Sequence, residues 1–96
     1  MPKRVYISGP MTGVENYKDA FYEAEDYLLS KGYKVINPAY NDDVMPNANY
    51  EEYMALDMFL LNLCDGIYML KGWEKSCGAN REYGYALAKG MEIMFE

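Results

Sequence analysis

The chain has 96 residues, a length that suits one domain and leaves too little apolar material for two separate cores. Hydrophobic residues make up 51% of it and charged residues 25%, a composition typical of a folded globular protein rather than a disordered one. The formal net charge is -6. The basic residues are scattered along the sequence, which argues against a nucleic-acid polymer as partner.

Histidine is absent from the sequence. This excludes Ser-His-Asp and Cys-His catalysis and histidine-ligated zinc within one chain, so acid–base chemistry falls to carboxylates or tyrosines. Cys64 and Cys77 lack the spacing of a metal site, and we interpret them as reduced structural thiols. The N-terminus lacks an apolar export signal, and no apolar run approaches the roughly 18 residues of a membrane span. We therefore expect a cytoplasmic protein with no metal, no cofactor and no membrane partner.

The first predicted strand and the first predicted helix have clear ends. Residues 4–8 are β-branched and aromatic, and this run stops at Gly9 and Pro10, where a strand must end. From 16 to 31, apolar residues recur every three or four positions between charged ones, which predicts an amphipathic helix. Gly32 follows directly and is expected to cap that helix.

A second strand, a loop and a second helix come next. Residues 33–36 predict a short strand, which Asn37 and Pro38 cut off. The stretch from there to Asn49 is rich in Asn, Asp and Pro, and we expect it to be an exposed loop. Residues 50–64 have apolar residues at helical spacing and predict the second helix.

The rest of the chain alternates strand and helix once more. It predicts a strand at 66–70, a loop at 71–75, a helix at 78–89 ended by Gly90, and a strand at 91–95. Short connections between alternating strands and helices are typical of a parallel sheet with helices on both faces. We predict one α/β domain over residues 1–96, flavodoxin-like or Rossmann-like, with a four-stranded parallel sheet in the order 2-1-3-4. Ligands of such sheets bind beyond the carboxyl ends of the strands where strand order reverses, here between strands one and three.

Two carboxylates occupy positions that should otherwise be apolar. Asp57 interrupts the apolar stripe of the second helix, and a buried aspartate needs a compensating partner. It either caps a neighbouring loop, pairs with a lysine or serves the crevice. Glu82 borders the face of the third helix that packs on the sheet, at helical spacing from Ala79 and Ala86. Close to the helix N-terminus it is expected to stay ionised; the competing interpretation is a solvated glutamate favoured by the helix dipole.

The loops around the predicted crevice offer further candidates. The segment from Gly9 to Gly13 lies where phosphate-binding or sugar-binding loops lie in such folds, yet it matches neither the dinucleotide nor the Walker pattern. Ser76 opens the third helix, where small residues let backbone amides approach a ligand. Trp73 is the only tryptophan, placed either to stack on a base or to close the core. Tyr6 lies on the central strand just before the first loop.

With these residues identified, the chain resembles the nucleoside 2-deoxyribosyltransferase superfamily, in the short form common in phages and bacteria. The resemblance covers nearly the whole chain. The pieces that carry it are VYISGPMTG (5–13), Asn37-Pro38, DMFLLNLCD (57–65), GWEKS (72–76) and, most specifically, GANREYGYALA (78–88). It implies that Glu82 is the nucleophile, that Asp57 assists the leaving base, and that Tyr6 lies beside the nucleophile.

The resemblance implies cleavage or transfer at the N-glycosidic bond of a (deoxy)nucleoside or nucleoside 5′-monophosphate. Related 2′-deoxynucleoside 5′-phosphate N-glycosidases carry serine at the position of Ser76, whereas the arginine of their first loop is replaced here by Thr12, so both substrates stay open. The alternatives are an NAD-type glycosidase on the same fold and a non-catalytic nucleotide-binding or phage accessory protein. The candidate substrate-binding residues are Ser8, Gly9, Met11, Thr12, Asn37, Trp73, Ser76 and Gly78.

The second helix carries more apolar residues than one face against a sheet can bury. Besides the stripe around Asp57 it has Tyr50, Tyr53, Met54, Met58, Phe59 and Leu63. A helix that is apolar on several sides is usually buried on several sides. Because most soluble oligomers are two-fold symmetric, we expect a homodimer or a tetramer packed through the second and third helices, with the partner walling the crevice.

Overall fold

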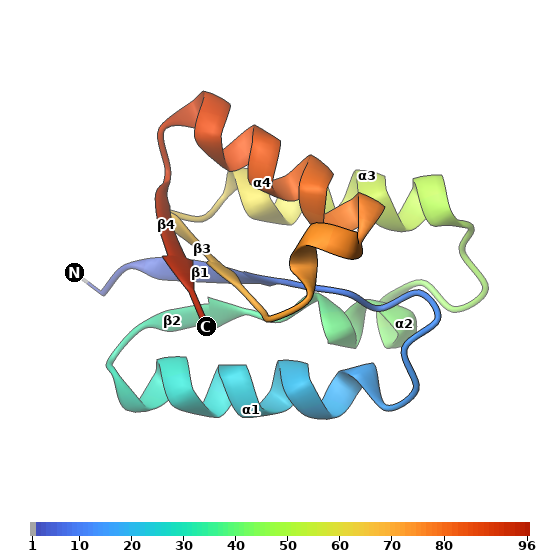
Figure 1. Cartoon of the computed structure of the whole chain (residues 1–96), viewed down its shortest axis with the longest axis horizontal. Helices are drawn as coiled ribbons and strands as arrows, with labels where there is room; N and C mark the ends of the chain where they lie inside the picture. The colour runs from blue at the N-terminus through green and yellow to red at the C-terminus, as the bar shows by residue number, and fades with distance from the viewer. Residues whose placement is uncertain (1) are drawn as a thin grey trace.

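A four-stranded parallel sheet forms the middle layer of the structure, a computed structural model that describes residues 2–96 (Figure 1). Its strand order is β2-β1-β3-β4, which confirms the predicted α/β class and strand order. In chain order the elements are β1 (Arg4–Ser8), α1 (Tyr17–Ser30), β2 (Lys34–Ile36), α2 (Asn41–Val44), α3 (Tyr50–Asn62), β3 (Gly66–Met69), α4 (Cys77–Lys89) and β4 (Glu92–Phe95), with short 3₁₀ helices at Pro38–Tyr40 and Trp73–Lys75.

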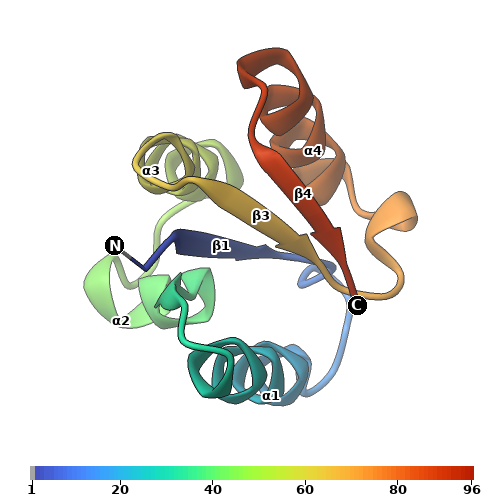
Figure 2. The ribbon, with the colours of Figure 1, turned by 90° about the vertical axis from the view of Figure 1, so that its left-hand side faces the viewer.

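The helices cover both faces of this sheet, α1 on one side and α3 and α4 on the other (Figure 2). The central strand β1 supplies side chains to both layers because successive residues of a strand point to opposite faces. Val5 and Ile7 belong to the core cluster under α1, together with Phe21. Tyr6 faces the opposite cluster, formed with residues of α3 and α4, and Ser8 reaches α4 on that same side. The strand thus presents two polar hydroxyls to the layer that contains α4.

The stretch 37–44 corrects the sequence analysis, which expected an exposed loop from there to Asn49; only residues 45–49 form one. Residues 38–40 form a 3₁₀ helix and 41–44 form α2, and Asn37 and Asn41 are each 6% exposed. The Asn-Pro pair starts a helical turn here: the side-chain oxygen of Asn37 accepts a hydrogen bond from the amide of Ala39 at 3.0 Å. Its amide group donates to the backbone oxygen of Phe21 at 3.3 Å. Polar residues that look like loop residues in the sequence are therefore buried and hydrogen-bonded to other parts of the fold.

The other elements lie within two residues of their predicted positions. Two glycines with positive φ end helices as expected, Gly32 after α1 and Gly90 at the C-cap of α4. The predicted loop 71–75 contains the second 3₁₀ helix. Of the helices in residues 2–96, none has both the length and the apolar character that a membrane crossing demands.

Gly9 sits at the end of β1, where the chain enters the first loop, and it has no room for a side chain. A Cβ built on it would lie 2.8 Å from Cβ of Leu70 and 2.9 Å from Cδ1 of the same residue. Gly9→Ala should therefore lower the free energy of unfolding by about 1–3 kcal/mol through overpacking. Gly84→Ala in α4 is the matched control, since nothing lies within 4 Å of its added Cβ, and it should raise stability by up to about 1 kcal/mol. Urea unfolding of the three proteins checks this; equal effects of both variants would contradict it.

Candidate active site

A cavity of about 860 Å³ lies beyond the carboxyl ends of β1 and β3, the place where the sequence predicts a ligand crevice. Its wall is assembled from the loop after β1, the first half of α1, the α2 segment, one face of α3 and the start of α4. Its polar and charged lining residues are Thr12, Tyr17, Asn41, Asp42, Tyr50, Tyr53, Asp57, Lys75, Ser76 and Glu82.

Glu82 is held at this cavity through both of its carboxyl oxygens. The hydroxyl of Tyr6 donates to Oε2 at 2.6 Å, and the hydroxyl of Ser8 donates to Oε1 at 2.6 Å. Tyr6 and Ser8 lie two residues apart on the same face of the central strand and are fully buried, whereas Glu82 is 5% exposed. The interpretation of Glu82 as a solvated glutamate at a helix start is therefore wrong, and its side chain has one fixed position.

The pKa of Glu82 is higher than its place near a helix N-terminus suggests. Burial raises this pKa to about 7, and the nearby charge of Asp57 adds to the rise. The hydrogen bonds from Ser8 and Tyr6 act in the opposite direction and lower this pKa. Removal from water outweighs these favourable contacts because the side chain packs against the sheet.

Asp57 is the second buried carboxyl of the cavity, 8% exposed. Its partner is neither a lysine nor a loop backbone: the side-chain amide of Asn41 donates to Oδ1 at 2.6 Å. Burial raises the pKa of Asp57 to about 6; the hydrogen bond from Asn41 lowers it, and the charge of Asp42 raises it further. Two carboxyls of one cavity thus titrate close to neutrality, a property common among catalytic groups.

The start of α4 and the first loop contribute small residues to the same cavity. The side-chain oxygen of Ser76 accepts from the backbone amide of Ala79 at 3.2 Å, the N-cap interaction that the sequence predicts. The predicted binding residues that line the cavity are Gly9, Met11, Thr12, Ser76 and Gly78, and Ser8 reaches it through Glu82.

Two predicted binding residues lie outside this lining. The ring of Trp73 packs on Tyr83 at 4.6 Å between centroids and lies 6.2 Å from that of Phe95, so it closes the core beside α4. Asn37 caps the 3₁₀ helix that follows it and does not line the cavity. Its side chain is used within the fold, which leaves it unsuited to bind a substrate there.

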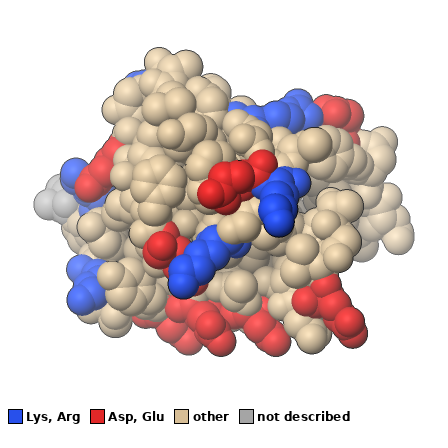
Figure 3. Space-filling view, viewed as in Figure 1, with Lys and Arg blue, Asp and Glu red and all other residues tan. Residues whose placement is uncertain are grey.

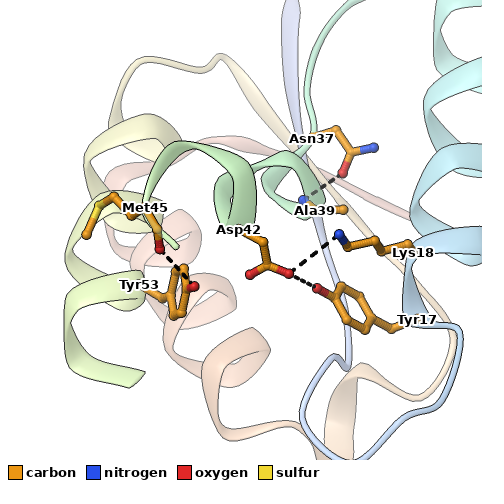
Figure 4. A network of polar contacts seen from close by, with 7 residues as sticks. All are labelled: Tyr17, Lys18, Asn37, Ala39, Asp42, Met45 and Tyr53. Carbon is orange, nitrogen blue, oxygen red and sulfur yellow. Dashed lines mark hydrogen bonds and ion pairs between the residues drawn. The ribbon is translucent and has the colours of Figure 1, made fainter. Parts of the chain in front are cut away.

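Sequence reasoning missed the residues that the α2 segment brings to the cavity (Figure 4). Tyr17 of α1 donates to Oδ2 of Asp42 at 2.6 Å, and Tyr53 of α3 donates to the backbone oxygen of Met45 at 2.9 Å. These contacts tie the segment to both neighbouring helices. The run of Asn and Asp residues at 41–43 is the signal that the sequence offers, but the same composition is typical of an exposed loop.

Acidic and basic side chains are distributed differently over the surface (Figure 3). On the face shown, acidic atoms gather along the edge formed by α1, while basic atoms are scattered among acidic ones. That face therefore lacks the continuous basic surface that follows a phosphate backbone.

The raised pKa of Glu82 predicts a stability that depends on pH. Between its ordinary value of 4.5 and about 7, the folded state keeps a proton that the unfolded state has lost, so this group's contribution to stability falls as pH rises. The Gln side chain of Glu82→Gln does not titrate, so this loss of stability with rising pH is absent from the variant. The free energy of unfolding of the variant relative to the wild type should rise by about 3 kcal/mol between pH 4.5 and pH 8. Chemical denaturation across this range checks it, and a difference that is constant with pH would mean that Glu82 is ionised throughout.

Two comparisons with known proteins complete the description of the site. A search of the curated proteins finds none that matches this chain. Neither comparison bears on the resemblance to nucleoside 2-deoxyribosyltransferases, which stays a prediction. A family model matches residues 3–95, nearly the whole chain, and the protein therefore belongs to the family described as Domain of unknown function (DUF4406).

Proposed function

We propose that this protein cleaves or transfers at the N-glycosidic bond of a (deoxy)nucleoside or nucleoside 5′-monophosphate, with Glu82 as the nucleophile. The observation that carries the proposal is the Glu82 carboxyl itself. It is almost fully buried, held through both oxygens by Tyr6 and Ser8, and placed at a cavity that Asp57 also lines. A cavity of this size accommodates a small ligand.

In the proposed reaction a carboxylate oxygen of Glu82 attacks C1′ of the sugar. The bond from C1′ to the base nitrogen breaks through an oxocarbenium-like state, and its electron pair stays on the base. Asp57 gives the departing base its proton. Water, or the nitrogen of a second base, then attacks C1′ and releases Glu82; Asp57 takes up the proton that the attacking group loses. Hydrolysis and transfer share the first half of this sequence.

Tyr6 and Ser8 orient the nucleophile in this scheme. Both hydroxyls donate to the carboxyl, so they stabilise its negative charge before attack. Burial, together with the charges of Glu82 and Asp57, raises the pKa of Tyr6 well above 10.0. Tyr6 therefore keeps its proton at neutral pH and remains a donor.

The cavity lining combines two kinds of group that suit a polar small molecule. Gly9, Thr12, Lys75 and Ser76 come from the loop after β1 and from the residues before α4, and they support binding of a sugar or a 5′-phosphate. Asn41 and Asp42 come from α2 and Asp57 from α3. Because Asp57 protonates the base, the proposal puts the base beside Asp57 and Asn41.

Self-association remains a prediction of the sequence analysis. Phe59 and Leu63 of α3 are 63% and 49% exposed in the single chain, and Leu87 of α4 is 55% exposed. These apolar side chains support the proposed interface through the second and third helices.

The first test is release of free base from a panel of nucleosides, deoxynucleoside 5′-monophosphates and NAD, measured by chromatography. Glu82→Gln should lower the rate by at least about a thousandfold, because an amide cannot form the covalent intermediate. Glu23→Gln changes an exposed glutamate of α1 and should keep the wild-type rate. Equal turnover by Glu82→Gln and the wild type would refute the nucleophile. Binding of a nucleotide without release of base would favour the non-catalytic alternative, and release from NAD alone would favour the NAD-type glycosidase.

The second test is the pH dependence of base release. The reaction needs an ionised Glu82 and a protonated Asp57, so the rate should rise as this pair loses its first proton and fall as it loses the second. With pKa values of about 7 for Glu82 and about 6 for Asp57, the profile should be a narrow bell in that region. Asp57→Asn should abolish the falling limb and lower the maximum. A bell that survives in Asp57→Asn would rule out its role as the acid.

A further inference from the structure

Asn41 is the first residue of α2 and is only 6% exposed. Its side-chain amide donates to Oδ1 of Asp57 at 2.6 Å, and both residues line the cavity. We propose that Asn41 is the positioning residue for the acid: it reserves Oδ1 of Asp57 as an acceptor and so directs the proton to Oδ2. This inference rests on the proposed function, and it adds a residue to which neither the resemblance nor the sequence analysis gives a role.

The direction of the hydrogen bond decides which oxygen carries the proton. An amide NH₂ group is only a donor, and a protonated carboxyl has one O–H and one acceptor oxygen. A proton on Oδ1 would face the N–H of Asn41 at 2.6 Å, so it occupies Oδ2. No residue within 2–96 forms a hydrogen bond with Oδ2. That oxygen is thus free to donate to a leaving base.

Among the groups that act on the pKa of Asp57, Asn41 is the one that favours the ionised carboxylate. Burial and the charge of Asp42 from α2 both raise the pKa of Asp57, whereas the Asn41 hydrogen bond lowers it. The charge of Asp57 in turn raises the pKa of Glu82 in α4 and the pKa of Tyr6 in β1. Asp57 must give up a proton and later take one back, so the donor at position 41 keeps its acidity within a working range.

Contacts of the residues after Asn41 keep α2 in place, and Figure 4 draws those of Asp42 and Met45. The backbone oxygen of Asn41 accepts from the amide of Met45 at 2.9 Å. Tyr53 holds the other side of Met45 by a hydrogen bond of 2.9 Å to its backbone oxygen. Asp42, the next residue in the chain, accepts from Tyr17 at 2.6 Å. The segment that follows Asn41 is therefore tied to α1 and α3, and the amide is oriented before any ligand binds.

The test is a titration of the Asp57 carboxyl carbon by NMR in the full chain, which requires no turnover. Asn41→Ala should raise the pKa of Asp57 by about one pH unit or more, since it removes a hydrogen bond to a charged group. Asn37→Ala is the matched control: Asn37 is equally buried and belongs to the same segment, but it bonds Phe21, Glu25 and Ala39 instead. An unchanged pKa in Asn41→Ala, or an equal shift in Asn37→Ala, overturns the proposal.

Asn41→Asp keeps the shape of the side chain and decides the question if the alanine variant does not fold. An ionised aspartate cannot donate, so residues 41 and 57 should together hold one proton to a higher pH than Asp57 does in the wild type. If the pair at positions 41 and 57 loses its last proton at the same pH as Asp57 does in the wild type, the proposal is overturned.

Kinetics separate a positioning role from direct contact with the substrate. With a substrate that the wild type cleaves, Asn41→Ala should lower kcat and move the falling limb of the pH profile upward, while KM stays within about twofold. An increase in KM at unchanged kcat would overturn the proposal, because Asn41 would then bind the substrate. Failure of the wild type to release any base would refute the proposed function, whereas the titration would still decide whether Asn41 controls Asp57.

Discussion

The contact between Glu82 and the central strand is the constraint on which the site depends. A carboxyl inside a sheet-facing layer is stable only if its oxygens receive hydrogen bonds, and β1 provides them from Tyr6 and Ser8. These donors are two residues apart, the spacing that puts side chains on one face of a strand. Because β1 pairs with β2 on one side and β3 on the other, the backbone that carries both hydroxyls is fixed by the sheet. The position of the carboxyl is thus determined by the most constrained part of the fold.

The second carboxyl is positioned by a different kind of support. Asp57 comes from α3, but its partner Asn41 comes from a four-residue helix, which is too short to be stable alone. That helix is kept in place by side chains of α1 and α3, through Tyr17 and Tyr53. The position of Glu82 is therefore set by a strand of the sheet, whereas that of Asp57 depends on a short helix held by side chains of α1 and α3. The difference suits the roles proposed for them, a nucleophile in a fixed position and an acid that exchanges a proton with a departing group.

Much of the fold was predictable because the strong signals in this sequence are local. Hydrophobic periodicity located α1 and α3, Gly32 and Gly90 located two helix ends, and alternation of elements implied the parallel sheet. The place of Glu82 followed from helical spacing. What could not be predicted depends on contacts between distant residues: the burial of Asn41 arises from a bond to a residue 16 positions away. The pKa of Glu82, raised to about 7, likewise follows from desolvation, which no local pattern reports.

The single tryptophan has a practical consequence for spectroscopy. Trp73 packs on Tyr83 and lies near Phe95 of the edge strand β4, and it is not part of the cavity lining. Its fluorescence emission therefore monitors how β4 and α4 pack against each other, rather than whether the cavity is occupied. Tyr6, Tyr17, Tyr50 and Tyr53 lie at or beside the cavity instead. An optical signal for ligand binding in this protein would have to come from tyrosine or from the ligand, while tryptophan emission would serve as an independent measure of unfolding.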